Sequence, residues 1–176
     1  MTTAIRSRPD ATEHDPYFAR YIDTVPAGNV TTILREDGKE LYAALAAIPE
    51  SRGDFRYAAD KWSVREVIGH LIDAERVFAY RALRIARGDS TPLASFDQDS
   101  YVRTAGSDQR TIADLAAELR AVRDGSVALF ASLREEAWDR KGTASGKTIS
   151  VRALAYIVAG HSRHHLKILR ERYLVG

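Results

Sequence analysis

Four segments of the chain carry apolar residues at spacings of three, four or seven positions, which is the repeat of one face of an α-helix. These segments span residues 30–48, 63–88, 111–133 and 150–173. No segment of useful length alternates polar and apolar residues, so no sheet is expected. Because amphipathic helices bury their apolar faces against one another, the pattern predicts an all-α four-helix bundle.

Capping residues mark the expected starts of three of these helices. Ser63 and Glu66 have the spacing of a capping box, and Thr111 with Asp114 repeats this pattern. Ser150 can cap the last helix. The three helices are therefore expected to begin at these residues.

The N-terminal residues differ in composition from the rest of the chain. Residues 1–14 are polar and are expected to form a flexible tail, which leaves residues 15–176 as a single domain. Asp15 followed by Pro16 is typical of a helix start, because proline suits the first helical position. A short extra N-terminal helix is therefore predicted before the bundle.

The composition is that of an ordinary globular protein, with 45% hydrophobic and 28% charged residues in a chain of 176. The apolar stretches are broken well before the roughly 20 residues that a membrane helix needs, and the first residues lack the apolar core of a signal peptide. The chain has no cysteine, which excludes disulfides, thiolate metal sites and a cysteine nucleophile. We therefore expect a cytoplasmic protein with no membrane partner.

The net charge of +2 is too small to indicate a nucleic-acid partner. In the most basic stretch, Arg163, Lys167 and Arg170 share one helical face near the expected end of the last helix. Cations are favourable at that end of a helix, and no aromatic residues interleave for base stacking. We interpret this stretch as a solvated helix face.

The histidines lie where apolar residues are expected. His161 and His165 are one helical turn apart, so their side chains can converge on one ion, and they continue the apolar stripe of the last helix. His70 lies at the edge of the inward face of the second helix. A buried imidazole without a partner is unfavourable by about 1–3 kcal/mol, and that partner is a metal ion, a carboxylate or a backbone carbonyl. The sequence thus offers His70, His161 and His165 as candidate metal ligands.

Three neutral nitrogen ligands suit borderline transition metals rather than calcium or magnesium. Zinc or nickel is favoured, with iron as a further candidate. Such a site usually keeps a fourth position open for water or substrate. The segment is not a zincin motif, because Ser162 follows His161 where that motif has glutamate.

Neighbouring residues supply further candidates. Glu66 and Asp73 lie one turn before and after His70, where a carboxylate could orient the imidazole, although both are also typical of exposed helix charges. His164 points about 100° away from His165 around the helix. A glycine directly precedes a histidine at two places, Gly69 and position 160. Each glycine either allows another segment to approach closely or is a helix defect.

Two segments of this chain resemble the DinB-like (damage-inducible) helical bundle family. The first segment is Lys61-Trp-Ser-Val-Arg-Glu-Val-Ile-Gly-His70-Leu-Ile-Asp-Ala-Glu75, and the second is Gly160-His161-Ser-Arg-His-His165-Leu-Lys-Ile-Leu. The connection from Thr91 to Tyr101 is also similar to the family's link between its second and third helices. The likeness covers most of the chain from about residue 15 to residue 173.

The resemblance implies a bundle with up-up-down-down helix order and metal ligands at His70, His161 and His165. Related folds include thiol-dependent transferases that use bacillithiol or mycothiol, a maleylpyruvate isomerase, and the metal-binding domain of ergothioneine-forming enzymes. Members often dimerise, so a homodimer is a further expectation.

Two hypotheses of function follow. In the first, the chain is a metal-dependent transferase or hydrolase that activates a low-molecular-weight thiol or a water against a small electrophile. The loops 89–110 and 139–149 would shape its pocket, with Arg81, Tyr101 and Arg152 as candidate substrate contacts. In the second, the chain is a non-enzymatic stress-response module with a structural or sensory metal. A third alternative is a purely structural bundle with hydrogen-bonded histidines and no ion.

Overall fold

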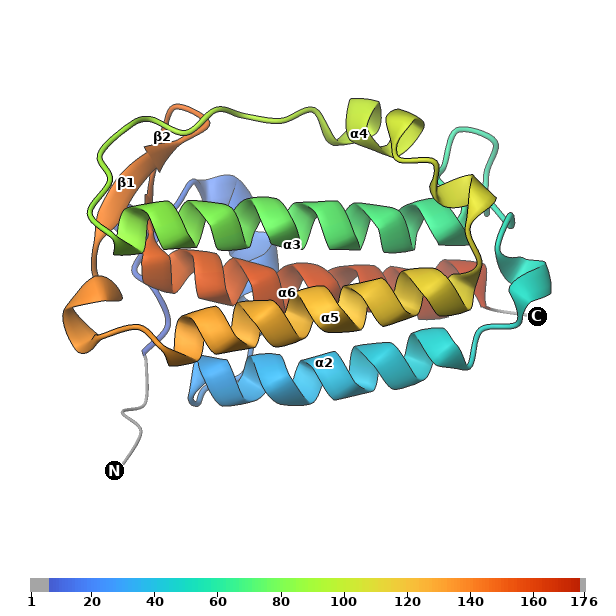
Figure 1. Cartoon of the computed structure of the whole chain (residues 1–176), viewed down its shortest axis with the longest axis horizontal. Coiled ribbons are helices and arrows are strands. Elements are labelled where there is room, and N and C mark those ends of the chain that lie inside the picture. Colours follow the sequence, from blue (N-terminus) through green and yellow to red (C-terminus); the bar gives the residue numbers. More distant parts are fainter. Residues whose placement is uncertain (1–6, 175–176) are drawn as a thin grey trace.

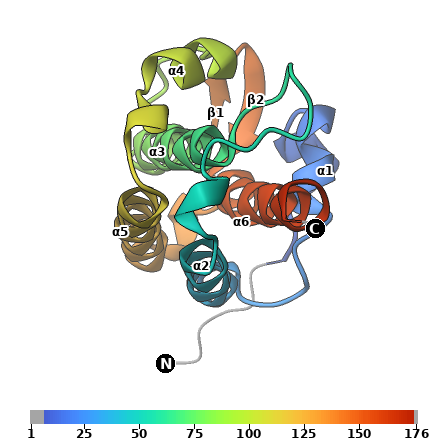
Figure 2. The same cartoon turned by 90° about the vertical axis from the view of Figure 1, so that its right-hand side faces the viewer.

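The computed structural model describes residues 7–174, and four long helices form its body. The four helices are α2 (Val30–Ala46), α3 (Val64–Ala86), α5 (Ile112–Ala131) and α6 (Val151–Ile168). They lie side by side along the long axis (Figure 1), and the end view shows them around a common core (Figure 2). The predicted four-helix bundle is confirmed.

The predicted caps begin the helices as expected. The Ser63 hydroxyl accepts from the backbone N–H of Glu66, whose carboxylate accepts from the N–H of Ser63 in turn. Thr111 accepts from the N–H of Asp114, and Ser150 caps α6 in the same way. Local sequence therefore sets where α3, α5 and α6 begin.

Contacts at one end of the bundle fix the helix directions. Glu50 follows α2 and accepts hydrogen bonds from Arg65 near the start of α3 at 2.5 Å and from the N–H of Ile112, which begins α5, at 2.9 Å. At the same end, the Tyr173 hydroxyl beyond α6 donates to the carbonyl of Trp62, just before α3, at 2.8 Å. The ends of α2 and α6 thus meet the starts of α3 and α5.

The helix order is therefore up-down-down-up, and the up-up-down-down order implied by the family resemblance is wrong. The parallel neighbours α3 and α5 need a connection that returns along the bundle, which residues 87–111 provide (Figure 1). Such a segment can span about 80 Å when extended, whereas a 20-residue helix is about 30 Å long.

Shorter elements connect and flank the four long helices. They are the 3-10 turns Ala11–Glu13, Pro16–Phe18, Glu50–Arg52, Ser107–Gln109 and Glu135–Ala137, the helices α1 (Ala19–Ile22) and α4 (Gln98–Thr104), the strands β1 (Lys141–Ala144) and β2 (Lys147–Ser150), and a π-helical turn over Leu169–Tyr173. The end view places α1 beside α6 and α4 outside α3 (Figure 2). The short N-terminal helix expected after Pro16 is thus present as a 3-10 turn that continues into α1.

The segment 139–149, expected to be a loop, contains an antiparallel hairpin. Strands β1 and β2 pair Lys141 with Ser150 and Ala144 with Lys147. Ser145 and Gly146 form the turn with positive φ angles of 54° and 73°, as two-residue hairpins require. Four-residue strands are too short to show a clear alternating pattern, so the sequence does not predict them.

The segment before residue 15 differs from the flexible tail that the sequence predicts, in its described part. Glu13 is buried, and its carboxylate accepts hydrogen bonds from Ser150 at 2.7 Å and from Arg152 at 2.5 Å. These contacts tie residues 10–14 to the start of α6. Residues 1–6 of the predicted tail lie outside the described residues.

Two glycines that precede histidines allow other segments to approach. A Cβ atom at Gly160 would lie 2.0 Å from the backbone oxygen of Tyr21, and one at Gly69 would lie 2.1 Å from Oγ of Ser107. Close packing of α1 on α6 and of the 3-10 turn at 107–109 on α3 therefore depends on the missing side chains.

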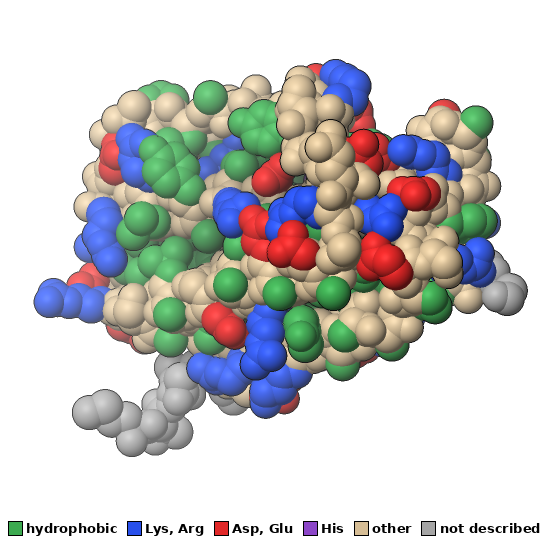
Figure 3. All heavy atoms as spheres, turned by 45° about the vertical axis from the view of Figure 1, so that its right-hand side comes forward, with side chains coloured by type: hydrophobic (Ala, Val, Ile, Leu, Met, Phe, Trp, Pro, Cys, Tyr) green, Lys and Arg blue, Asp and Glu red, His purple; other side chains and the backbone are tan. Residues whose placement is uncertain are grey.

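The basic residues of α6 contact α2 rather than solvent alone. Arg163 donates two hydrogen bonds of 2.6 Å to Asp37, and Arg170 pairs with Glu40 at 2.9 Å. On the face drawn in Figure 3, cationic and acidic side chains likewise lie beside one another. Within the described residues, no helix is both long and apolar enough to cross a bilayer.

Candidate metal centre

Three histidines from two neighbouring helices meet inside the bundle. His70 belongs to α3, whereas His161 and His165 occupy successive turns of α6. One ring nitrogen of each lies within 4.8 Å of one nitrogen of both others, and Nε2 of His70 is 3.0 Å from Nε2 of His161. The structure therefore brings together all three candidate ligands.

Burial keeps these imidazoles neutral. His70 and His161 are 4% and 5% exposed, and His165 is half-buried. Loss of hydration lowers the pKa of His70 to about 4 and that of His165 to about 3, and it holds the pKa of His161 well below its usual value. Near neutral pH each ring thus has one nitrogen lone pair free to bind a metal.

Aromatic side chains surround the imidazoles. The ring centroids of Trp62 and His70 are 4.7 Å apart. The rings of Tyr21 and Phe78 pack edge to face on His161, with centroid distances of 5.2 and 5.7 Å. These contacts restrict the orientation of both rings and limit access of water. Contacts between residues distant in sequence, such as Tyr21 with His161, carry no signal in the sequence.

Within the described residues, neither of the proposed orienting carboxylates, Glu66 and Asp73, forms a hydrogen bond with His70. Glu66 accepts from the N–H of Ser63 and pairs with Arg56 at 2.6 Å. Asp73 is half-buried, and that burial raises its pKa in spite of nearby Arg76. Within residues 7–174, no carboxylate oxygen belongs to the group of converging ligand atoms.

His164 lies beside the centre rather than in it, as its position on the helix predicted. Its ring packs against Tyr21 and His165, both at 5.2 Å. It is absent from the group of converging nitrogens among the described residues.

The donor set fits a divalent transition metal. Nitrogens bound at 2.0–2.1 Å to a tetrahedral zinc lie about 3.3 Å apart, and the separations of 3.0 to 4.8 Å bracket that value. Three nearby neutral nitrogens can form one N–H···N bond between two rings, but they cannot all donate to one another. An ion at their centre would satisfy all three.

A cavity of about 180 Å³ adjoins the histidines. Its lining comprises Tyr17, Phe18, Tyr21, His70, Ala74, Phe78, Arg81, Phe96, Gln98, Ser145 and His161. Phe96 and Gln98 come from the connection 89–110 and Ser145 from the segment 139–149, so both predicted loops contribute.

The three predicted substrate contacts have different positions. Arg81 lines the cavity beside the histidines. Tyr101 is exposed and packs on Phe96 at 5.2 Å, in a neighbouring hollow. Arg152 binds Glu13 away from the cavity. Only Arg81 of the three therefore lines this cavity.

Several solved structures have a similar fold. YfiT from Bacillus subtilis, described as a probable metal-dependent hydrolase with an unusual four-helix bundle topology, matches with a TM-score of 0.74 and 18% identity over 94% of this chain and 90% of its own. A mycothiol-dependent maleylpyruvate isomerase matches with a TM-score of 0.68 and 13% identity over 88% of this chain, which spans 63% of the isomerase. Likeness at these identities shows the fold alone.

A DinB-like protein from Bacillus subtilis has a TM-score of 0.58 and 21% identity, over 80% of this chain and 86% of its own. No curated protein matches the sequence significantly. The sequence model of the DinB superfamily matches residues 33–169, which include all three converging histidines. The chain therefore belongs to the DinB superfamily.

Proposed function

We propose that this protein binds one divalent transition metal through His70, His161 and His165, and that it is a metal-dependent transferase or hydrolase. Its substrates would be a low-molecular-weight thiol or water and a small electrophile. The observation that carries this proposal is the cavity beside His70 and His161. A metal with a purely structural role has no need of a cavity beside its ligands.

The number and type of ligands support an open coordination position. Three neutral imidazoles suit zinc or nickel, with iron as a further candidate, and three-ligand sites keep a place for water or substrate. A bound ion of this kind lowers the pKa of a thiol or water in that place. No carboxylate of the described residues is placed to fill it.

The protein's own residues would then bind and shield the reactants. The three imidazoles hold the ion, and the rings of Tyr21 and Phe78 exclude bulk water from its cavity side. The thiol must come from outside, because the chain has no cysteine. A volume of about 180 Å³ suits a small substrate.

Two similar structures support this class of function. The isomerase depends on mycothiol, and YfiT is described in terms of metal-dependent hydrolysis. Their low identity leaves the thiol and the electrophile of this chain to experiment.

The proposal is tested by elemental analysis of untagged protein, followed by conjugation assays with mycothiol, bacillithiol and glutathione. We expect about one equivalent of metal and a thiol- or water-dependent turnover that is lost after chelation and restored by zinc or nickel. Bound metal without an exchangeable water and without turnover would favour the alternative, a non-enzymatic stress-response or interaction module. Protein without metal would contradict both.

A further inference from the structure

Arg81 is a buried cation where three cavities meet. It is 4% exposed and comes from α3. It lines the cavity beside the histidines, a second of about 240 Å³ along the hairpin and a third of about 490 Å³ under residues 91–96. Arg81 thus contributes to the walls of all three cavities.

The described residues provide hydrogen-bond acceptors for only one nitrogen of the Arg81 side chain. Nη2 donates to the carbonyl of Ala94 at 2.6 Å and to Oγ of Ser145 at 3.1 Å. Nε and Nη1 have no hydrogen-bond partner among the described residues, and neither atom is fully buried. The N–H groups of these two nitrogens therefore remain for a ligand.

No anion of the described protein balances this charge. None of the carboxylates in residues 7–174 forms an ion pair with Arg81, whereas the other deeply buried arginine, Arg123, pairs with Glu75. Burial alone acts on Arg81 and lowers its pKa. Because an unpaired buried charge is unfavourable, the site is suited to an anionic ligand.

The geometry of α3 connects this cation with the histidines. His70, Ala74, Phe78 and Arg81 lie within one face of the helix, at successive spacings of four, four and three, and all four line the same cavity. The alanine leaves space between the imidazole end and the guanidinium end. One small molecule can therefore extend between them.

We propose that Arg81 binds the carboxylate of a small anionic electrophile, whose other end faces His70 and His161. The carboxylate would accept a hydrogen bond from a free N–H group of this guanidinium, and such a charge-assisted hydrogen bond is stronger than one between neutral groups. That the bound anion is the electrophile rests on the proposed function. Binding of a carboxylate at Arg81 stands on the buried, unpaired guanidinium.

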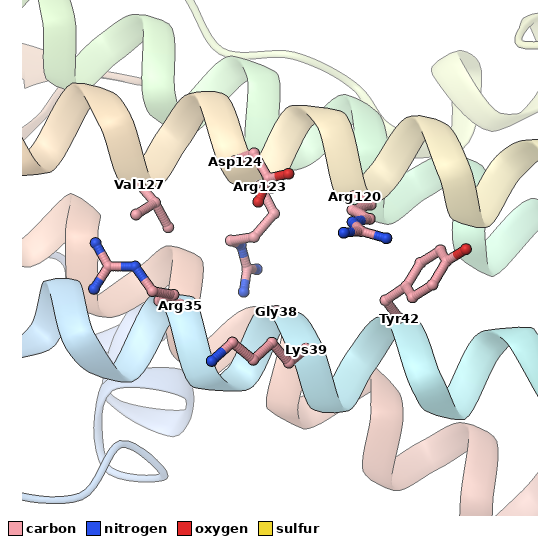
Figure 4. Close-up of a pocket in the computed structure, with 8 residues that line it drawn as sticks. All are labelled: Arg35, Gly38, Lys39, Tyr42, Arg120, Arg123, Asp124 and Val127. Carbon is pink, nitrogen blue, oxygen red and sulfur yellow. The ribbon is translucent and has the colours of Figure 1, made fainter.

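A basic hollow elsewhere provides the competing site. Between α2 and α5, Arg35, Lys39 and Arg120 line about 390 Å³ of space, with Asp124 at its edge (Figure 4). These three cations are exposed, Lys39 pairs with Glu36 at 2.9 Å, and Arg120 lies over the ring of Tyr42, while the buried Arg123 at the base of the hollow is paired with Glu75. This hollow serves as the matched control.

The test compares butyrate with butyramide, which differ in charge but hardly in size, by calorimetric titration of metal-loaded protein. We expect butyrate to bind and butyramide to bind at least about tenfold more weakly, the usual effect of a charge-assisted hydrogen bond. Arg81→Gln should remove this preference, while Arg120→Gln should keep it. Equal binding of both probes to the unmodified protein, or none, overturns the proposal.

A preference that persists in Arg81→Gln also overturns the proposal, because a bound ion or the basic hollow would then hold the carboxylate. Should Arg81→Gln fail to fold, Arg81→Lys decides. That variant keeps the positive charge but loses the guanidinium N–H groups, so it should bind butyrate more weakly than the unmodified protein yet still better than butyramide. If the unmodified protein prefers butyrate but shows no turnover with thiols or water, the proposed function is rejected and the carboxylate site at Arg81 stands.

Discussion

Arg123 donates two hydrogen bonds of 2.8 Å to the carboxylate of Glu75, Nε to Oε1 and Nη2 to Oε2, in the interior of the bundle. The two side chains are 3% and 5% exposed and connect α5 with α3. Arg123 also donates to Oγ of Ser162 at 3.1 Å, one residue from His161. A buried ion pair of this kind joins three helices next to the candidate metal centre.

Breaking this pair should destabilise the protein strongly. Arg123→Met leaves the Glu75 carboxylate buried without a partner, so we expect the free energy of unfolding to fall by about 3–5 kcal/mol. Chemical denaturation measures it. The control is Arg170→Met, which breaks the exposed ion pair between Arg170 and Glu40. We expect it to lower the free energy of unfolding by less than about 1 kcal/mol. Equal losses in the two variants would show that the buried pair has no special weight.

Replacing His161 with Ala should remove the metal from the purified protein. The variant lacks the ring whose Nε2 faces His70, and two remaining imidazoles bind an ion far more weakly than three. Its melting temperature should no longer respond to added zinc or nickel. His164→Ala is the matched control, because that ring lies outside the converging group, and it should retain one equivalent. A His161→Ala protein that keeps a full equivalent would show that the ligands are assigned wrongly.

The two helical glycines at 160 and 125 should respond oppositely to Ala. A Cβ at Gly160 collides with the backbone of Tyr21, so Gly160→Ala should lower the free energy of unfolding by about 1–3 kcal/mol. At Gly125 the added Cβ would have no atom within 4 Å, and Gly125→Ala should raise it by about 0.5–1 kcal/mol. Thermal denaturation of both variants checks the signs, and a stabilised Gly160→Ala protein would contradict the packing of α1 on α6.

Acid should weaken the attachment of the N-terminal segment through Glu13. Burial raises the pKa of this carboxyl, but hydrogen bonds from Arg152, the backbone of Asp10 and Ser150 outweigh it, and the net shift is downward. A lowered pKa in the folded state means that this contribution is present above the ordinary value of about 4.5 and is lost as the pH falls through the folded value.

The unmodified protein should therefore lose more stability than Glu13→Gln between pH 5 and pH 3. The comparison removes the contribution of the histidines, which both proteins share. Unfolding curves at several pH values measure the difference. Parallel pH profiles would show that Glu13 titrates alike in the folded and unfolded chain.

The long helices were predictable because each carries its own evidence, an apolar stripe and a cap. Ser63 with Glu66 marks the start of α3, and Ser150 that of α6. The helix order was not predictable in this way, because the direction of a helix depends on how its connection runs. The contacts of Glu50 with Arg65 and Ile112 show the helix order in the structure, and they join residues distant in sequence.

The candidate site was predictable as far as it follows from helical faces. His161 and His165 had to point inward with their stripe, and His70 lay at the edge of another. The free N–H groups of Arg81 were not predictable, because they depend on its contacts with Ser145 in the hairpin turn and with the carbonyl of Ala94. Short elements without a repeat leave little trace in a sequence.

The coordination of the ion itself is the most direct test. X-ray absorption at the edge of the metal in purified, untagged protein should show three imidazole nitrogens and a further light atom that exchanges with solvent or added thiol. The nitrogen shell should fall to two in a His70→Ala protein reloaded with the metal. A spectrum without histidine nitrogens, or one unchanged by His70→Ala, would contradict a metal centre built from these three histidines.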